Sequence, residues 1–235
     1  MHDGFFRRYA SQGYEWGDRG YPISDEYNDR GVTRQDFQHG SYWWGAIPAG
    51  TYTHGVPFFA QPNNYFCLPA AGMMVLEDLG AWHAADGAPL NVYDLAHRMN
   101  TDTYMYTSFS EAKFAQGMNS WLGANVYSAI RTPSYETVRD SVLHSFETGY
   151  ASVVDEQERR GGPHFNGHNN GTFGHGMVVN SYDMYNDSVQ FADPGTSIWA
   201  GASEYFWYPS LWDFTSQHLQ HQFAPHDSLG IYTAR

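Results

Sequence analysis

The stretch QPNNYFCLPAAGMMVLEDLG, residues 61–80, contains the only cysteine of this 235-residue chain. Apolar side chains recur at helical spacing over residues 67–79, and Gly80 is a typical residue just beyond a helix end. Pro69 is tolerated in a first turn, so the pattern predicts a helix that begins at Cys67. A helix N-terminus favours the thiolate, the reactive form of cysteine. Cys67 is therefore a candidate nucleophile; the alternative is a small buried thiol, the common fate of a free cysteine.

His175 is the strongest candidate for a base among the twelve histidines. It opens the run HGMVVNSYD, which predicts a strand, and the run SVQFADPG predicts a second strand that ends near Asp193. If the two strands pair as an antiparallel hairpin across residues 185–187, His175 and Asp193 face each other at its open end. Asp193 would then orient the imidazole, although Asp-Pro-Gly is also ordinary turn chemistry. Asp183 is the alternative orienting residue, but it lies at the predicted hairpin tip.

The tetrahedral intermediate of acyl transfer needs hydrogen-bond donors for its oxyanion. The backbone N–H of Cys67 is one candidate. The side chain of Gln61, six residues earlier, is a second candidate if the intervening loop folds back. Asn63 or Asn64 could take the place of Gln61 in this role.

The remaining pattern divides the chain into two segments, residues 1–55 and 56–235. In the first, Gly and Pro alternate with aromatic residues, which predicts short strands and turns around an aromatic core. In the second, helical patterns precede β-rich runs, which predicts an α+β domain rather than alternating β–α–β units. The expected helices span residues 67–79, 90–99, 110–122 and 134–147, the last with Ser134 as N-cap, and the expected strands lie within 150–157, 175–183, 188–195 and 230–234.

In this order, Gln61, Cys67, His175 and Asp193 resemble the catalytic residues of the papain-like superfamily. Within it, CLPAAGMM followed by HGMVV and ADPG is most similar to the peptidases that process double-glycine bacteriocin leaders, and to their secreted relatives without a transporter. Those proteins typically carry Cys-Gly-Pro-Ala and His-x-Val-Val-Val…Asp-Pro. The resemblance implies a papain-like cysteine peptidase fold over residues 56–235, a Cys–His–Asp triad, and Gln61 at the oxyanion.

Leu68 departs from this family pattern, because it stands where the family usually has glycine. We expect its bulky side chain to form the wall of the cleft beside Cys67 and to influence which substrates fit. No transporter segments follow, so leader processing coupled to export is not implied.

The segment GDRGYPISDE, followed by RQDFQHGSYWW, resembles the LGFP repeat of actinobacterial envelope proteins. The resemblance implies an envelope-associated or substrate-positioning module within residues 1–55. The alternative is an aromatic N-terminal extension that packs on the main domain. The matching positions are Gly20, Pro22, Phe37, Gly40 and Trp44, with Arg19 in place of the leucine and Tyr21 after Gly20.

Composition narrows the class of partner. The formal net charge of −13 repels phosphate backbones, which argues against nucleic acid, and no apolar run is long enough to span a bilayer. A single cysteine excludes an intrachain disulfide and a multi-cysteine zinc site. Abundant Tyr, Trp and Gly with a single lysine suggest a secreted or envelope-associated bacterial protein, and no signal peptide is visible at the start of the sequence.

Residues 159–174 read RRGGPHFNGHNNGTFG, a long polar loop. His164, His168 and His175 match no compact zinc pattern, so we expect a flexible, histidine-rich surface loop and no metal or cofactor. Three later tryptophans could line a substrate groove: Trp199, Trp207 and Trp212.

Together these features predict a cysteine hydrolase that cleaves a peptide or isopeptide bond in a peptide or protein substrate, through a thioester acyl-enzyme on Cys67. The first alternative is the same thioester chemistry with another outcome, that of a transglutaminase-like acyltransferase or a protein deamidase. The second is a non-catalytic protein whose N-terminal segment binds a cell-envelope component.

Overall fold

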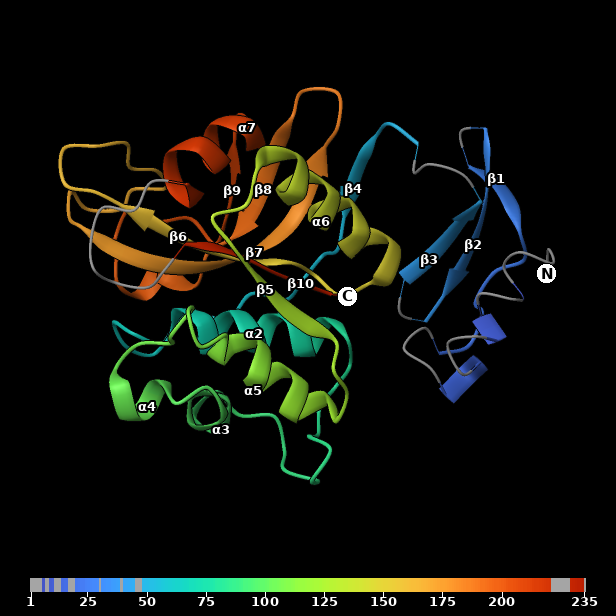
Figure 1. The fold of residues 1–235 in the computed structure, drawn as a ribbon, viewed down its shortest axis with the longest axis horizontal. Helices are drawn as coiled ribbons and strands as arrows, with labels where there is room; N and C mark the ends of the chain where they lie inside the picture. Colours follow the sequence, from blue (N-terminus) through green and yellow to red (C-terminus); the bar gives the residue numbers. More distant parts are fainter. Residues whose placement is uncertain are drawn as a thin grey trace.

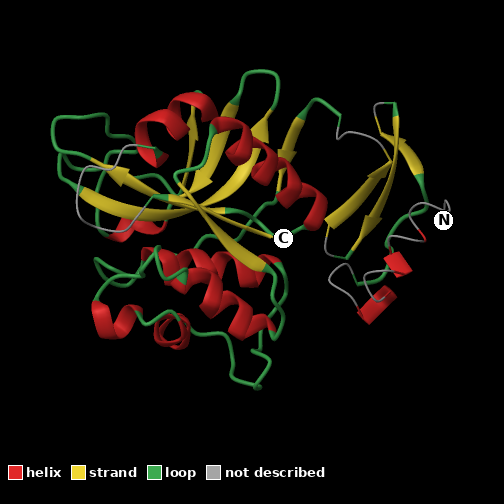
Figure 2. Ribbon diagram, viewed as in Figure 1, coloured by secondary structure: helices red, strands yellow, loops and turns green. Residues whose placement is uncertain are grey.

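The computed structural model describes residues 6, 9–10, 14–16, 20–29, 31–38, 40–44, 48–220 and 229–234. It is a mixed α and β fold in which helices cover both faces of a large antiparallel sheet (Figure 1, Figure 2). The α+β class expected from the sequence is confirmed at this level. In the described part of the chain, no helix is both long and apolar enough to cross a membrane.

The main sheet consists, among the described residues, of β4 (Thr51–Thr53), β5 (Tyr127–Arg131), β6 (Val153–Glu158), β7 (Phe173–Asp183), β8 (Ser188–Ala192), β9 (Tyr205–Tyr208) and β10 (Gly230–Ala234). Their order is β5–β10–β6–β7–β8–β9, with β4 also paired to β7. β8 pairs with one edge of β7, whereas β6 and then β4 pair with its other edge. The long central strand β7 therefore connects the two halves of the sheet, and it carries His175.

Helix α2 (Cys67–Asp78) begins at Cys67, as predicted, and residues 68–76 are all buried. Such burial on every side is typical of a helix at the centre of a core. The helix ends in a Schellman motif, in which Gly80 has a φ of +66° and the N–H of Ala81 donates to the oxygen of Leu76 at 2.8 Å. The first core contains residues of α2, α3 (Val92–Arg98) and α5 (Lys113–Leu122), and α4 (Thr101–Tyr104) packs on α3. These helices are drawn below the sheet in Figure 1.

The opposite face of the sheet is covered by α6 (Tyr135–Thr148), α7 (Leu211–Phe214) and the π-helical turn η3 (Thr215–Leu219). Ser134 is the N-cap of α6, as predicted, because its side chain accepts the N–H of Thr137 at 3.3 Å. Apolar residues of these helices form a second core with the other face of the sheet. The sheet is thus buried on both faces, which explains why β6 and β7 are buried along almost their whole length.

Each strand expected after residue 149 is present, with its ends shifted by a few residues. The helices expected at 90–99 and 110–122 are shorter and begin at Val92 and Lys113. Strands β4, β5 and β9 and helix α4 were not expected. Each is only three to five residues long, so a periodic pattern has too few positions in which to show.

The N-terminal segment forms a smaller antiparallel sheet of β1 (Tyr27–Asp29), β2 (Val32–Phe37) and β3 (Gly40–Trp44), near the short 3-10 helix η1 (Tyr14–Trp16). Its core is aromatic, as predicted: Tyr9, Phe37 and Tyr42 are buried against one another. Trp43 instead belongs to the core beneath α6, so this sheet packs on the main domain.

The boundary between residues 55 and 56 stays a prediction. β4 lies before that boundary, yet it pairs with β7 and belongs to the main sheet. The LGFP resemblance also stays a prediction. Pro22 pairs with Phe37 at the end of β2, whereas Arg19 lies outside the described residues.

Candidate active site

The thiol of Cys67 lies at the first residue of α2 and is half-buried. The preceding residue, Phe66, is the N-cap, and among the described residues no side chain caps this helix start. Pro69 has no N–H, and the N–H groups of the first turn are not used by intrahelical bonds. The backbone N–H groups of Cys67 and Leu68 are therefore left for a partner outside the helix, and the positive end of the helix dipole lies at the thiol.

His175 lies on β7 with only 1% of its surface exposed. Its Nε2 is 2.7 Å from Oδ1 of Asp193, and the ring also hydrogen-bonds Cys67. Since Nε2 faces the carboxylate, Nδ1 is the nitrogen left for the thiol. Burial alone would lower the pKa of His175, but the charge and hydrogen bond of Asp193, together with Cys67, raise it well above its usual value.

Asp193 follows β8, is fully buried, and accepts hydrogen bonds from four donors. Its Oδ1 accepts from His175 and from the N–H of Gly195, each at 2.7 Å. Its Oδ2 accepts from Nδ2 of Asn166 at 2.6 Å and from Nε2 of His168 at 2.8 Å. Burial alone would raise the pKa of Asp193, but the two histidines lower it well below its usual range. Asp193 therefore both holds the turn at Gly195 and faces the imidazole of His175.

Gln61 is buried against the segment that follows Asp193. Its backbone N–H donates to the oxygen of Pro194 at 2.9 Å, and Oγ of Ser197 donates to its carbonyl oxygen at 2.5 Å. Nε2 of Gln61 donates to the oxygen of Asn63 at 2.6 Å, while Oε1 has no hydrogen-bond partner among the described residues. The amide carries two N–H groups, so one remains for a ligand oxygen.

Among the alternatives for these roles, Asn63 lies directly beside Gln61, whose Nε2 donates to the backbone oxygen of Asn63. Oδ1 of Asn63 accepts the N–H of Tyr65 in a local turn, and Asn64 is exposed. Asp183 lies at the tip of the β7–β8 hairpin, where it accepts hydrogen bonds from the N–H of Tyr185 and from Nδ2 of Asn186.

The expectation that Leu68 forms the cleft wall is wrong, because its side chain is 2% exposed and points into the α2–β7 interface. It occupies the space above Gly176, where an added Cβ would lie 2.5 Å from Cδ2 of Leu68. The residue after Cys67 is turned by about 100° around the helix, and this rotation carries its side chain from the cleft to the sheet.

The expectation of a flexible, exposed histidine loop is also wrong at His168, whose side chain is fully buried. Nδ1 of His168 is 2.5 Å from Oε1 of Glu158, and the ring of Trp199 lies over it with centroids 3.8 Å apart. His164 contacts the other oxygen of the same Glu158 carboxylate. The sequence offers one weak signal for this cluster, which is the charged ending of the β-rich run VVDEQE.

Of the three tryptophans proposed for a groove, Trp199 is next to the site and also meets the ring of His175 edge-on at 4.9 Å. Trp207 on β9 and Trp212 in α7 are about half exposed.

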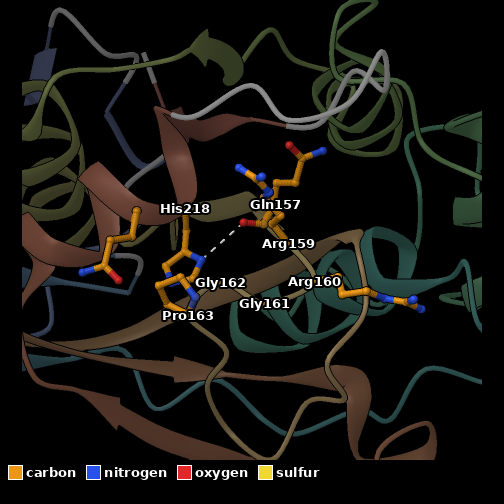
Figure 3. A pocket seen from close by; sticks show the side chains of 8 residues that line it. Gln157, Arg159, Arg160, Gly161, Gly162, Pro163 and His218 are labelled. Atoms are coloured by element: carbon orange, nitrogen blue, oxygen red, sulfur yellow. Dashed lines mark hydrogen bonds between the residues drawn. The ribbon is translucent and has the colours of Figure 1, made fainter.

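A cavity of about 420 Å³ opens at the end of β6 (Figure 3). On its wall, Nδ1 of His218 lies 3.3 Å from the backbone oxygen of Gln157. The cavity is lined by Gln157, Arg159, Arg160, Gly161, Gly162, Pro163, Gln217 and His218.

His168, His175 and Asp193 are also the group that could be considered for a metal ion, because their polar atoms lie within 4.8 Å of one another. Their N···O separations of 2.7 and 2.8 Å are those of direct hydrogen bonds. Protons shared between the ring nitrogens and the carboxylate therefore account for the geometry.

A half-buried thiol at a helix start, next to a buried histidine–carboxylate pair on an antiparallel sheet, is the arrangement of a cysteine peptidase. The chain belongs to the Peptidase_C39 like family, whose profile matches residues 53–216, well over half of its length. The membership confirms the cysteine peptidase class expected from the sequence. The closer resemblance to the double-glycine peptidases and the secreted or envelope location stay predictions.

Among solved structures, the chain is similar to xylellain, a cysteine protease from Xylella fastidiosa. The identity is 12%, the TM-score is 0.42, and the match covers 93% of this chain and 96% of that one. Among curated protein sequences, none matches the chain.

Proposed function

We propose that this protein hydrolyses a peptide or isopeptide bond through a thioester formed on Cys67. The observation that carries the proposal is the position of the His175 ring between two groups. Its Nε2 lies 2.7 Å from Oδ1 of Asp193, and the ring is also hydrogen-bonded to Cys67. The buried carboxylate fixes the ring so that Nδ1 faces the thiol, and it stabilises the imidazolium.

In the first half of the reaction, Nδ1 of His175 holds the thiol proton while the sulfur of Cys67 attacks the carbonyl carbon. The new C–S bond moves an electron pair onto the carbonyl oxygen. The backbone N–H of Cys67 and the remaining Nε2–H of Gln61 would then stabilise this oxyanion. When the tetrahedral intermediate collapses, the C–N bond breaks and His175 gives its proton to the leaving amine.

In the second half, Nδ1 of His175 takes a proton from water, and the resulting hydroxide attacks the thioester carbon. The C–S bond breaks, the carboxylic acid leaves, and the proton returns to the Cys67–His175 pair. Asp193 remains ionised throughout, because four hydrogen-bond donors surround its carboxylate.

The first prediction concerns the substrate. Wild type and Cys67→Ala are incubated with mixtures of peptides and proteins, and the products are measured by mass spectrometry. We expect wild type to add one water across a cleaved amide, and we expect the rate to fall by about 10³-fold or more in Cys67→Ala and in His175→Ala. Loss of ammonia without cleavage would instead indicate a deamidase, and a cross-linked mass would indicate an acyltransferase.

A native Cys67 that does not react with iodoacetamide at neutral pH would contradict the enzymatic proposal altogether. The chain has no other cysteine, so thiol alkylation of the intact protein reports Cys67 alone.

A further inference from the structure

A buried row of polar side chains continues from His175 past Asp193. His168 lies between two carboxylates, with Nε2 at 2.8 Å from Oδ2 of Asp193 and Nδ1 at 2.5 Å from Oε1 of Glu158. The side chains of His168, Asp193 and Glu158 are all fully buried. These contacts are therefore made away from water, where hydrogen bonds between charged groups are stronger.

The donors and acceptors of this row fit one pattern of protons. A neutral imidazole has one donor and one acceptor nitrogen, whereas an ionised carboxylate only accepts. Asp193 receives four donors, which favours its ionised form. His168 satisfies both carboxylates when each of its nitrogens carries a proton. The charges then alternate along Glu158, His168, Asp193, His175 and Cys67.

We propose that His168 is a positioning residue of this site: held as an imidazolium between Glu158 and Asp193, it aims the Asp193 carboxylate at His175 and limits how firmly that carboxylate retains the His175 proton. The proposal rests on the proposed function, in which Cys67 and His175 form the reactive pair.

The surroundings of His168 support this charge pattern. Burial alone would lower the pKa of His168, but its hydrogen bonds to Asp193 and Glu158 raise it. Burial and the charge of Glu158 raise the pKa of nearby Glu156 well above its usual range, which favours the neutral form of Glu156.

Two further histidines complete the surroundings. Burial lowers the pKa of His218 in η3, which favours its neutral form, and its Nδ1 lies 3.4 Å from Oε2 of Glu156. His164, on the loop of His168, contacts the other oxygen of Glu158. Glu158, His168 and Asp193 form the continuous hydrogen-bonded row that leads to His175.

The alternating charges predict the direction in which each substitution shifts the pH at which His175 loses its proton. Asp193 divides its charge between two imidazolium rings whose centroids are 5.2 Å apart. Without the charge of His168, more of that charge stabilises His175, which then keeps its proton to higher pH. Without the charge of Glu158, the net positive charge near His175 increases, so His175 loses its proton at lower pH. A charge at this separation is expected to move the midpoint by roughly one pH unit.

The experiment measures the reaction of Cys67 with iodoacetate over a range of pH. This anionic reagent reacts faster while the neighbouring imidazolium keeps its proton, so the pH at which the rate falls reports His175. The variants are His168→Gln, which keeps a donor toward Asp193, Glu158→Gln, and the double variant. His97→Gln is the matched control, because His97 is exposed and pairs with Asp102 at the surface.

We expect the midpoint to rise by about one pH unit in His168→Gln, to fall in Glu158→Gln, and to return near the wild-type value in the double variant and in the control. Shifts of the two single variants in the same direction, or no shift, would overturn the proposal. Such a result would follow from a merely structural role, in which either substitution loosens the site in the same way.

A second measurement needs no variant. The ¹⁵N chemical shifts of the His168 ring in the wild-type protein are expected to show both nitrogens protonated at neutral pH. One unprotonated nitrogen would overturn the proposal even if the substituted proteins failed to fold. A wild-type Cys67 without an iodoacetate-reactive thiolate would overturn the proposed function, whereas a normal wild-type profile with unshifted variants would overturn only the role of His168.

Discussion

At the scale of single residues, the α2–β7 interface depends on a complementary pair. Leu68 follows the nucleophile and Gly176 follows the histidine, and the leucine side chain fills the space that the glycine leaves. Their contact fixes the distance between the start of α2 and the strand that carries His175. The bulky residue beside Cys67 therefore sets the position of the site rather than the shape of its cleft.

This packing predicts that Gly176→Ala is destabilising. The added Cβ would lie 2.5 and 2.7 Å from side-chain carbons of Leu68, so the interface must shift. We expect a loss of about 1–3 kcal/mol in the free energy of unfolding, measured by urea titration. In the double variant that combines Gly176→Ala with Leu68→Ala, the loss of unfolding free energy should be smaller than the sum of the two single losses. The reason is that the smaller side chain at position 68 removes the clash.

Gly201→Ala is the control for that comparison, since its nearest neighbour atom would lie at an ordinary 3.5 Å. Strictly additive losses in the double variant would contradict the pairing of Leu68 with Gly176.

At the scale of elements, a β-bulge in β7 decides whether the histidine and the aspartate can meet. The hairpin pairs Asp183 with Ser188, and its register shifts by one residue between Val179 and Ser181. Beyond the shift, Val178 pairs with Ala192. When this pairing is continued by one residue, Asp193 lies opposite Met177, on the face that also carries His175. Without the bulge, Asp193 would fall opposite Val178, whose side chain belongs to the core on the other face.

The turn of this hairpin is held by Asp187, a non-glycine residue with a φ of +56°. Its Oδ1 accepts the hydroxyl groups of Tyr135 in α6 and Tyr182 in β7, both at 2.8 Å. Its Oδ2 accepts the N–H of Trp212 at 3.0 Å and Oγ of Ser210 at 3.2 Å. One side chain thus joins the hairpin to both helices on that face of the sheet.

We predict that Asp187→Ala lowers the free energy of unfolding by about 2–4 kcal/mol, because three partly buried hydroxyl groups and one exposed N–H lose their acceptor. Asp187→Asn should lose only about 1–2 kcal/mol, since asparagine tolerates the left-handed conformation and keeps one acceptor oxygen. Thermal and urea unfolding would measure both. Asp183→Ala, in the same turn but bonded only within it, is the control, and an equal loss there would contradict the role of Asp187.

At the scale of the whole molecule, the helical layers and the N-terminal part meet at His54, just after β4. Its Nε2 lies 3.0 Å from Oγ of Ser145 in α6, its ring stacks on Phe146 at 4.5 Å, and its Nδ1 lies 4.0 Å from the Asp78 carboxylate of α2. Burial lowers the pKa of His54 to about 3, whereas burial raises the pKa of Asp78 to about 6.

These two groups make stability depend on pH in opposite directions. As the pH falls from 6.5 toward about 3, the unfolded chain protonates His54 and the folded protein does not, so His54 reduces stability in this window. Asp78 takes up its proton in the folded state first, near pH 6, and so increases stability as the pH falls.

We therefore predict that, relative to His54→Gln, the wild type loses about 3 kcal/mol of unfolding free energy between about pH 7 and about pH 4. Glutamine keeps a hydrogen-bonding group near Ser145 but does not titrate. Urea titrations at both pH values measure the difference, with His97→Gln as the exposed control. If the unfolding free energies of wild type and His54→Gln depended on pH in the same way, the lowered pKa of His54 would be contradicted.

The sequence by itself determined the features that arise within a few residues. The first-turn Pro69 and the left-handed Gly80 delimit α2, and Ser134 begins α6, because caps and backbone preferences act locally. The β-rich runs around His175 and Asp193 were readable for the same reason. Family membership agrees with the cysteine peptidase class that those motifs indicated.

Only the tertiary structure decided which side chains meet over long separations. The bulge in β7, the packing of Leu68 on Gly176, and the burial of His168 between Glu158 and Asp193 have no periodic signal in the sequence. A polar loop residue is ordinarily exposed, and it becomes buried here because two carboxylates from different strand ends and the ring of Trp199 enclose it. Such an enclosure depends on the packed fold as a whole, which local preferences do not encode.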